Sequence, residues 1–153
     1  DGDGDGDGDG DGDCPVAPAP PGANQCPEAC TGGCHNNNTL CVIDCEGDAA
    51  CDEQDLVCPP EFDCQINCIG VDACDSGSVT CPPMYGCEIN CDGGNDACGD
   101  QQLMCGDGPC VVNCGDDACS GLNAQCGAGP CEATCGNPPP TLECADSCAC
   151  APC

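Results

Sequence analysis

The chain has 153 residues, of which 26 are cysteine and 28 are acidic, and its formal net charge is −28 because lysine and arginine are absent. A chain without basic side chains cannot pair with phosphate groups, which excludes nucleic-acid binding and electrostatic attachment to anionic lipid. No apolar run is long enough to insert into a membrane. With one Phe, one Tyr and no Trp, the core must be held by covalent bridges or by metal. An even number of cysteines, all able to pair, is typical of an oxidised, exported protein.

The first 25 residues are of low complexity. Residues 1–13 alternate Asp with Gly, and residues 14–25 are proline-rich, which is typical of a semi-rigid spacer. The alternating aspartates echo the first half of an EF-hand loop and would share one face in an extended chain, so we predict that they bind Ca²⁺. These candidate ligands are Asp1, Asp3, Asp5, Asp7, Asp9, Asp11 and Asp13. The alternative is a flexible, self-repelling linker.

Residues 26–135 contain a repeat with a period of about 23 residues. Five CxxxC segments begin at positions 41, 64, 87, 110 and 131. A corner rich in Gly and Asp follows each of the first four, ends in Ala-Cys and leads into a stretch of fixed length to the next cysteine. Only the two links between these fixed segments vary in length, which indicates that the fixed segments are rigid and the links are turns.

The CxxxC segments have the two-residue period of strands. In residues 64–68 (CQINC), Cys64, Ile66 and Cys68 alternate with polar residues, so one face is expected to point inward. Gly, Pro, Asn and Asp are too frequent for helices. Strands and corners in coils of this length, stacked about 4.8 Å apart, predict a β-solenoid.

This layout resembles right-handed parallel β-helix proteins in a cysteine-rich, secreted form. The fold class expected is therefore all-β, a disulfide-stapled β-solenoid (parallel β-helix) of about four to five coils of 21–24 residues. The N- and C-terminal segments are expected to be irregular, with residues 136–153 forming a disulfide-rich C-terminal cap. The stacked positions Asp44, Asn67, Asn90, Asn113 and Thr134 look like the polar ladder that such folds often carry. The alternative is a string of small knotted disulfide modules.

The cysteines are expected to form structural bridges within coils, across each corner, where they lie five to seven positions apart. The residues expected in such bridges are Cys45, Cys51, Cys58, Cys64, Cys68, Cys74, Cys81, Cys87, Cys91, Cys98, Cys105, Cys110, Cys114, Cys119, Cys126 and Cys131. Two alternatives are thiolate metal binding, as in metallothioneins, and redox chemistry at the terminal CAPC motif of Cys150 and Cys153.

A second group of aspartates lies within the repeat. Asp72, Asp96 and Asp117 each precede an Ala-Cys cysteine by two positions, so a solenoid would stack them in a column. Two carboxylates about 4.8 Å apart repel by about 1 kcal/mol in water and by roughly 3–4 kcal/mol at an effective dielectric of 20. Bound Ca²⁺ would turn that repulsion into attraction, and we predict that these three residues bind it. The alternative is that each aspartate caps turn amides. No organic cofactor is expected.

The sequence offers no convincing catalytic centre. His35 is the only histidine and lies in a polar run, so no Ser or Cys nucleophile has an evident base. A carboxylate glycosidase would need cationic or aromatic side chains to hold its substrate. We therefore expect a secreted, non-enzymatic structural protein, extracellular or at the cell surface. Its expected partners are cations and further copies of itself, in a self-assembling fibre, surface layer or matrix. The alternatives are a monomeric cation-binding or adhesive cell-surface module and a thiolate metal-sequestering protein.

Overall fold

The computed structural model describes residues 14–153, so the seven aspartates predicted to bind Ca²⁺ in residues 1–13 lie outside the described part of the chain. The described residues form twelve short strands and no helix, and hence no helix that could span a bilayer. The strands of the larger sheet are β1 (Gly33–His35), β2 (Leu40–Glu46), β4 (Asp63–Ile69), β6 (Cys87–Asp92), β8 (Cys110–Cys114), β10 (Cys131–Thr134) and β12 (Cys150–Ala151). The strands of the smaller sheet are β3 (Asp55–Val57), β5 (Ser78–Thr80), β7 (Gln102–Met104), β9 (Asn123–Gln125) and β11 (Thr141–Glu143).

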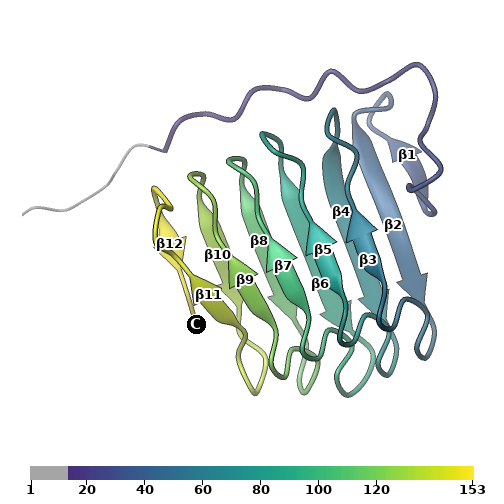
Figure 1. Cartoon of the computed structure of the whole chain (residues 1–153), viewed down its shortest axis with the longest axis vertical. Helices are drawn as coiled ribbons and strands as arrows, with labels where there is room; N and C mark the ends of the chain where they lie inside the picture. The colour runs from purple at the N-terminus through teal and green to yellow at the C-terminus, as the bar shows by residue number, and fades with distance from the viewer. Residues whose placement is uncertain (1–13) are drawn as a thin grey trace, which may run out of the picture.

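The two sheets are built from successive coils of one parallel β-solenoid (Figure 1). From β2 onward each coil adds one strand to each sheet, and neighbouring strands are parallel. The register follows the repeat, because Cys64 lies opposite Cys87 and Ile66 opposite Ile89. The prediction of an all-β, disulfide-rich solenoid is confirmed, with about five turns.

The core is a thin stack of aliphatic and cysteine side chains between the sheets. Ile66, Ile89 and Val112 point inward from the larger sheet, and each has no exposed surface. Val79 and Leu103 point inward from the smaller sheet and are 0% and 1% exposed. Because alternate residues of a strand face opposite sides, the CxIxC segments of β2, β4 and β6 each place two cysteines and one isoleucine inside.

The corners that follow the larger sheet depend on left-handed backbone conformations on both sides of the corner cysteine. Two positions before that cysteine, φ is 54° at Ala49, 53° at Asp72, 52° at Asp96 and 59° at Asp117. Two positions after it, φ is again positive, as in Ser76 at 55°. Asp tolerates this region better than most residues, which accounts for its frequency here.

The two ends of the solenoid are built differently from its middle. Strand β1 is antiparallel to β2, so residues 33–35 end the larger sheet instead of beginning a parallel coil. The segment 136–153 was expected to be an irregular cap, yet it adds a parallel strand to each sheet, β11 beside β9 and β12 beside β10. The stack therefore continues into this segment, although the sequence repeat is no longer visible there.

The sequence predicts that the proline-rich segment is a semi-rigid spacer. In the structure this segment lies along the stack of coils. Cys14 forms a disulfide with Cys148, close to β12. The other end is held by the Gly22 amide, which donates to the Glu61 carbonyl at 2.9 Å, and by the Ala23 amide, which donates to the Asn38 carbonyl at 3.3 Å. We call residues 14–22 the strap; Figure 1 shows the N-terminal part of the described chain running across the coils from β12 toward β1.

Candidate functional site

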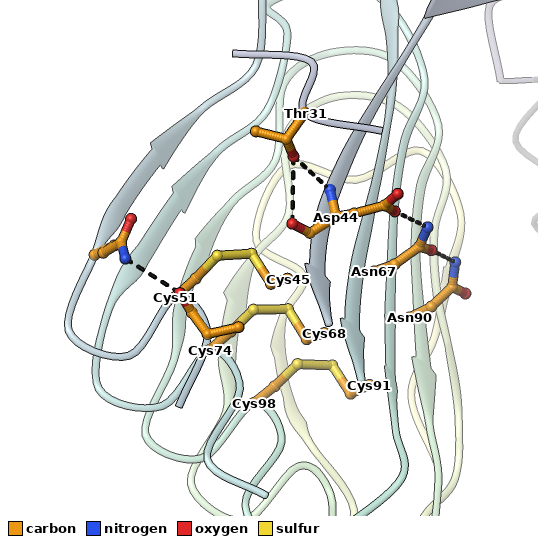
Figure 2. The surroundings of a disulfide bond; sticks show 12 residues. Thr31, Asp44, Cys45, Cys51, Asn67, Cys68, Cys74, Asn90, Cys91 and Cys98 are labelled. Carbon is orange, nitrogen blue, oxygen red and sulfur yellow. Dashed lines mark hydrogen bonds between the residues drawn. A yellow bond between two sulfur atoms is a disulfide. The ribbon is translucent and has the colours of Figure 1, made fainter. Parts of the chain in front are cut away.

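All 26 cysteines lie in residues 14–153 and form 13 disulfides, so no cysteine is free. Eight of the disulfides close corners within the coils of residues 26–135, with Cα–Cα distances between 5.6 and 6.0 Å. These pairs are Cys45–Cys51, Cys58–Cys64, Cys68–Cys74, Cys81–Cys87, Cys91–Cys98, Cys105–Cys110, Cys114–Cys119 and Cys126–Cys131. The structure thus pairs the sixteen predicted cysteines across corners, and Figure 2 shows three of these disulfides stacked in a column.

The other five disulfides all involve a terminal segment, and one of them, Cys144–Cys150, also closes the coil corner between β11 and β12. They are Cys14–Cys148, Cys26–Cys34, Cys30–Cys41, Cys135–Cys153 and Cys144–Cys150. The two cysteines of the CAPC motif are therefore bonded to other partners and not to each other. Thirteen disulfides indicate that the protein folds in an oxidising environment.

Three groups of cysteine sulfurs lie close enough together to hold a metal ion, but each sulfur is already bonded. The Sγ atoms of Cys81, Cys105 and Cys110 lie within 4.8 Å of one another, as do two other trios at the ends of the chain. All members belong to disulfides. Because a thiolate is the form that binds metal, these sulfurs offer no thiolate ligand while the disulfides are intact.

Carboxylates gather along the corners between the larger and the smaller sheet, a region that we call the acidic edge. Its residues are Asp48, Asp52, Glu53, Asp72, Asp75, Asp96, Asp100, Asp116 and Asp117. Asp96 and Asp117 line one hollow of about 310 Å³ together with Asn95, Ser120 and Pro138. Asp72 holds the same corner position in the preceding coil but does not line the hollow. The structure therefore brings two of the three predicted aspartates together at one hollow.

The backbone of these corners is paired between coils. The Asp72 amide donates to the Asn95 carbonyl at 3.2 Å, and the Asp96 amide donates to the Asp117 carbonyl at 2.8 Å. The Ala49 amide donates to the Val71 carbonyl at 2.9 Å in the same way. These corner amides are satisfied by carbonyl groups of the next coil, so the carboxylates of the column are not needed to cap them.

The acidic edge also contains a second row of carboxylates, which includes Asp52 and Asp75 and was not predicted from the sequence. Burial raises the pKa of Asp75; a hydrogen bond with the Ser76 side chain acts in the opposite direction, and the charges of Asp52, Asp100 and Asp72 raise it further. Asp52 and Asp75 directly follow a corner cysteine in the sequence, a recurrence that could have identified the row.

The outer face of the larger sheet carries the predicted polar ladder. The Asn67 amide donates to the Asp44 carboxylate at 2.8 Å, Asn90 donates to Asn67 at 3.0 Å, and Asn113 donates to Asn90 at 2.9 Å. The Thr134 hydroxyl closes the series by donating to Asn113 at 3.3 Å. Figure 2 shows the first members of the ladder beside the disulfide column. The ladder joins five coils by side-chain hydrogen bonds on the outside of the sheet, in addition to the backbone pairing.

A groove of about 580 Å³ separates the strap from the larger sheet. Ala17, Pro18 and Pro20 form one wall, and Val111 and Glu88 belong to the opposite one. The lining is mostly apolar and contains no basic side chain.

The only histidine lies at the surface, at the end of strand β1. His35 is exposed, and its Nε2 atom lies 3.2 Å from the Gly32 carbonyl oxygen. No protein family, curated protein or solved structure matches this chain.

Proposed function

We propose that the protein is a secreted, non-enzymatic structural component of an extracellular fibre, surface layer or matrix, acting as a stiff, anionic building unit. The observation that carries the proposal is the combination of 13 disulfides around a thin core with a surface that has no lysine or arginine. Each bridge can contribute about 2–4 kcal/mol by restricting the unfolded chain. Covalent closure therefore replaces the large aromatic core that this composition cannot supply.

Calcium is the cation that best suits the acidic edge. Carboxylate oxygens are hard ligands that Ca²⁺ accepts in flexible geometry, and extracellular modules bind it at about 10⁻⁴–10⁻³ M. Asp96 and Asp117 face one hollow, and Asp75 lies among like charges whose repulsion a divalent ion would relieve. Two copies of a chain with a net charge of −28 repel each other, so self-association would depend on bridging cations.

A monomeric cation-binding or adhesive module is the second candidate, and the ends of the larger sheet favour it. Strand β1 closes one end by pairing antiparallel to β2. At the other end β12 has two residues and is followed by Pro152, which has no amide hydrogen to extend the ladder. Both features hinder the addition of a further parallel strand to this sheet. Self-association would then depend on surfaces other than the ends of this sheet, such as the acidic edge.

Light scattering and negative-stain microscopy at about 0.15 M salt distinguish the two candidates. The structural proposal predicts that millimolar Ca²⁺ raises the melting temperature and produces assemblies that EDTA reverses. The double variant Asp96→Asn/Asp117→Asn should weaken the response to Ca²⁺. As a matched control, Asp55→Asn changes a carboxylate on the smaller sheet and should leave it unchanged. Dispersed particles at every Ca²⁺ concentration would support the monomeric module, and a melting temperature insensitive to both Ca²⁺ and EDTA would remove calcium from the proposal.

A further inference from the structure

The Cys14–Cys148 disulfide covalently joins the strap to the C-terminal segment of the chain. Cys14 and Cys148 are 134 positions apart in sequence, and their Cα atoms lie 5.3 Å apart. Cys153, the last residue, is bonded to Cys135 in the preceding coil. The point where the described chain begins and the point where it ends therefore lie at the same end of the stack of coils, the β12 end (Figure 1).

The strap is long enough to span the coils between its two attachments. Four of its residues are proline, namely Pro15, Pro18, Pro20 and Pro21. In an extended polyproline conformation, the eight steps from Cys14 to Gly22 cover about 25 Å, at about 3.1 Å per residue. The strands β4, β6, β8, β10 and β12 are successive neighbours, and at about 4.8 Å each their four spacings cover about 19 Å. The strap can therefore reach from β12 to β4 in an extended conformation.

The end of the strap at Cys148 is firmly attached to the last coils. The Cys148 amide donates to the Ala128 carbonyl at 3.1 Å, and the Ser147 hydroxyl donates to the Gly129 carbonyl at 2.7 Å. The nearby disulfide Cys144–Cys150 closes the loop that contains Cys148. A pull on Cys14 is thus delivered to a segment that is bonded both covalently and by hydrogen bonds.

We propose that the Cys14–Cys148 disulfide carries a pulling force past most of the solenoid, so that the force does not unwind the coils. A force that enters at Cys14 and leaves at Cys153 would pass through this disulfide and residues 148–153, so that only the last coil, which contains β12, would carry it. Without the disulfide, the same force would run through every coil and its corner disulfides, and would unwind the strands between them. This inference rests on the proposed structural function, in which a load-bearing component must keep its shape under tension.

Single-molecule stretching of the oxidised, full-length chain, with handles at its two ends, tests the proposal. In the unaltered protein the described part should lengthen by less than about 20 Å, the full reach of residues 148–153. The double variant Cys14→Ser/Cys148→Ser should release roughly 200 Å, because the strands between the remaining disulfides can then extend. The double variant Cys68→Ser/Cys74→Ser is the matched control. It also lacks one disulfide but keeps the bypass, so it should lengthen as little as the unaltered protein.

A long extension of the unaltered protein would overturn the proposal. An extension of the control variant as long as that of Cys14→Ser/Cys148→Ser would also overturn it. Peptide mapping without reductant provides a test that does not depend on the folding of any variant, because it must recover Cys14 linked to Cys148. Recovery of Cys14 bonded to a different cysteine would also overturn it. The stretching is done on single molecules without Ca²⁺, so its outcome is independent of whether calcium-dependent assembly is observed.

Discussion

The side-chain amide of Asn90 donates a 3.0 Å hydrogen bond to the side-chain oxygen of Asn67, which occupies the same position one coil earlier. Each Asn of the ladder donates to the preceding coil and accepts from the following one, so all these bonds point in one direction. The series must end at Asp44, because an ionised carboxylate accepts hydrogen bonds and cannot donate them. The carboxylate therefore sets the direction of the ladder.

Asn90→Asp is expected to break the ladder at neutral pH. The new carboxylate has no hydrogen to donate and would face the oxygen of Asn67, at a cost of about 1–3 kcal/mol. The melting temperature should fall by about 2–4 °C per kcal/mol in a chain of this size. Because protonation restores the donor, the pKa of the introduced carboxyl should be raised, and the loss should shrink as pH falls through it. Gln125→Glu, an exposed amide outside the ladder, is the matched control; an equal loss there would mean that added charge alone is responsible.

Gly70→Ala should destabilise the protein more than Gly47→Ala. Both glycines have a positive φ, 139° and 107°, so an alanine at either position is strained by about 1–3 kcal/mol. A Cβ at Gly70 would lie 2.7 Å from the backbone of Gly47, whereas a Cβ at Gly47 would meet no atom within 4 Å. Thermal unfolding of the two variants side by side measures the difference. Equal melting temperatures would show that stacking on the preceding coil does not restrict Gly70.

Ile66→Ala should cost about 2–5 kcal/mol, because the side chain is fully buried and its removal leaves a cavity between the sheets. Ile69 lies in the same strand but is 40% exposed, so Ile69→Ala should cost much less. Denaturant unfolding with the disulfides intact compares the two variants. A small loss for Ile66→Ala would indicate that the disulfides alone hold the coils together and that the aliphatic stack contributes little.

Asp75→Asn should stabilise the protein at neutral pH. The pKa of Asp75 is raised by burial and by neighbouring carboxylates, so the folded state favours the protonated form more than the unfolded state does. The ionised carboxylate therefore lowers stability at pH values above the raised pKa. This penalty fades as pH falls through the raised pKa, and it is absent below the pKa of the unfolded chain.

Melting temperatures of the Asp75→Asn variant and the unaltered protein, measured from neutral to acidic pH, should converge as the solution is acidified. The matched control is Asp146→Asn, an exposed aspartate in the C-terminal segment, which should show no such trend. A constant difference across the pH range would contradict the assignment, because the benefit would then not depend on the ionisation of Asp75.

Much of the fold was predictable because the coil repeats. The constant CxxxC spacing and the inward alternation of Cys64, Ile66 and Cys68 identified the strands. The links of variable length on either side of these segments form the corners that the disulfides close. The acidic column was only partly predictable. Asp96 and Asp117 reach one hollow, but Asp72 does not, because Pro138 and Ser120 of later coils help to form that hollow. Which aspartates line the hollow depends on the residues of the following coil. The position of an aspartate within its own repeat does not reveal this.

The sequence by itself determined the period of the repeat, the face of each CxxxC strand that points inward and the anionic surface, since each follows from residue type and local spacing. Only the tertiary structure decided what happens between distant residues. The Cys14–Cys148 bond and the strands β11 and β12 lie outside the repeat, so no local pattern indicates them. The direction of the Asn ladder also required the stacked coils, because a hydrogen bond between residues 23 positions apart exists only when stacking brings them together.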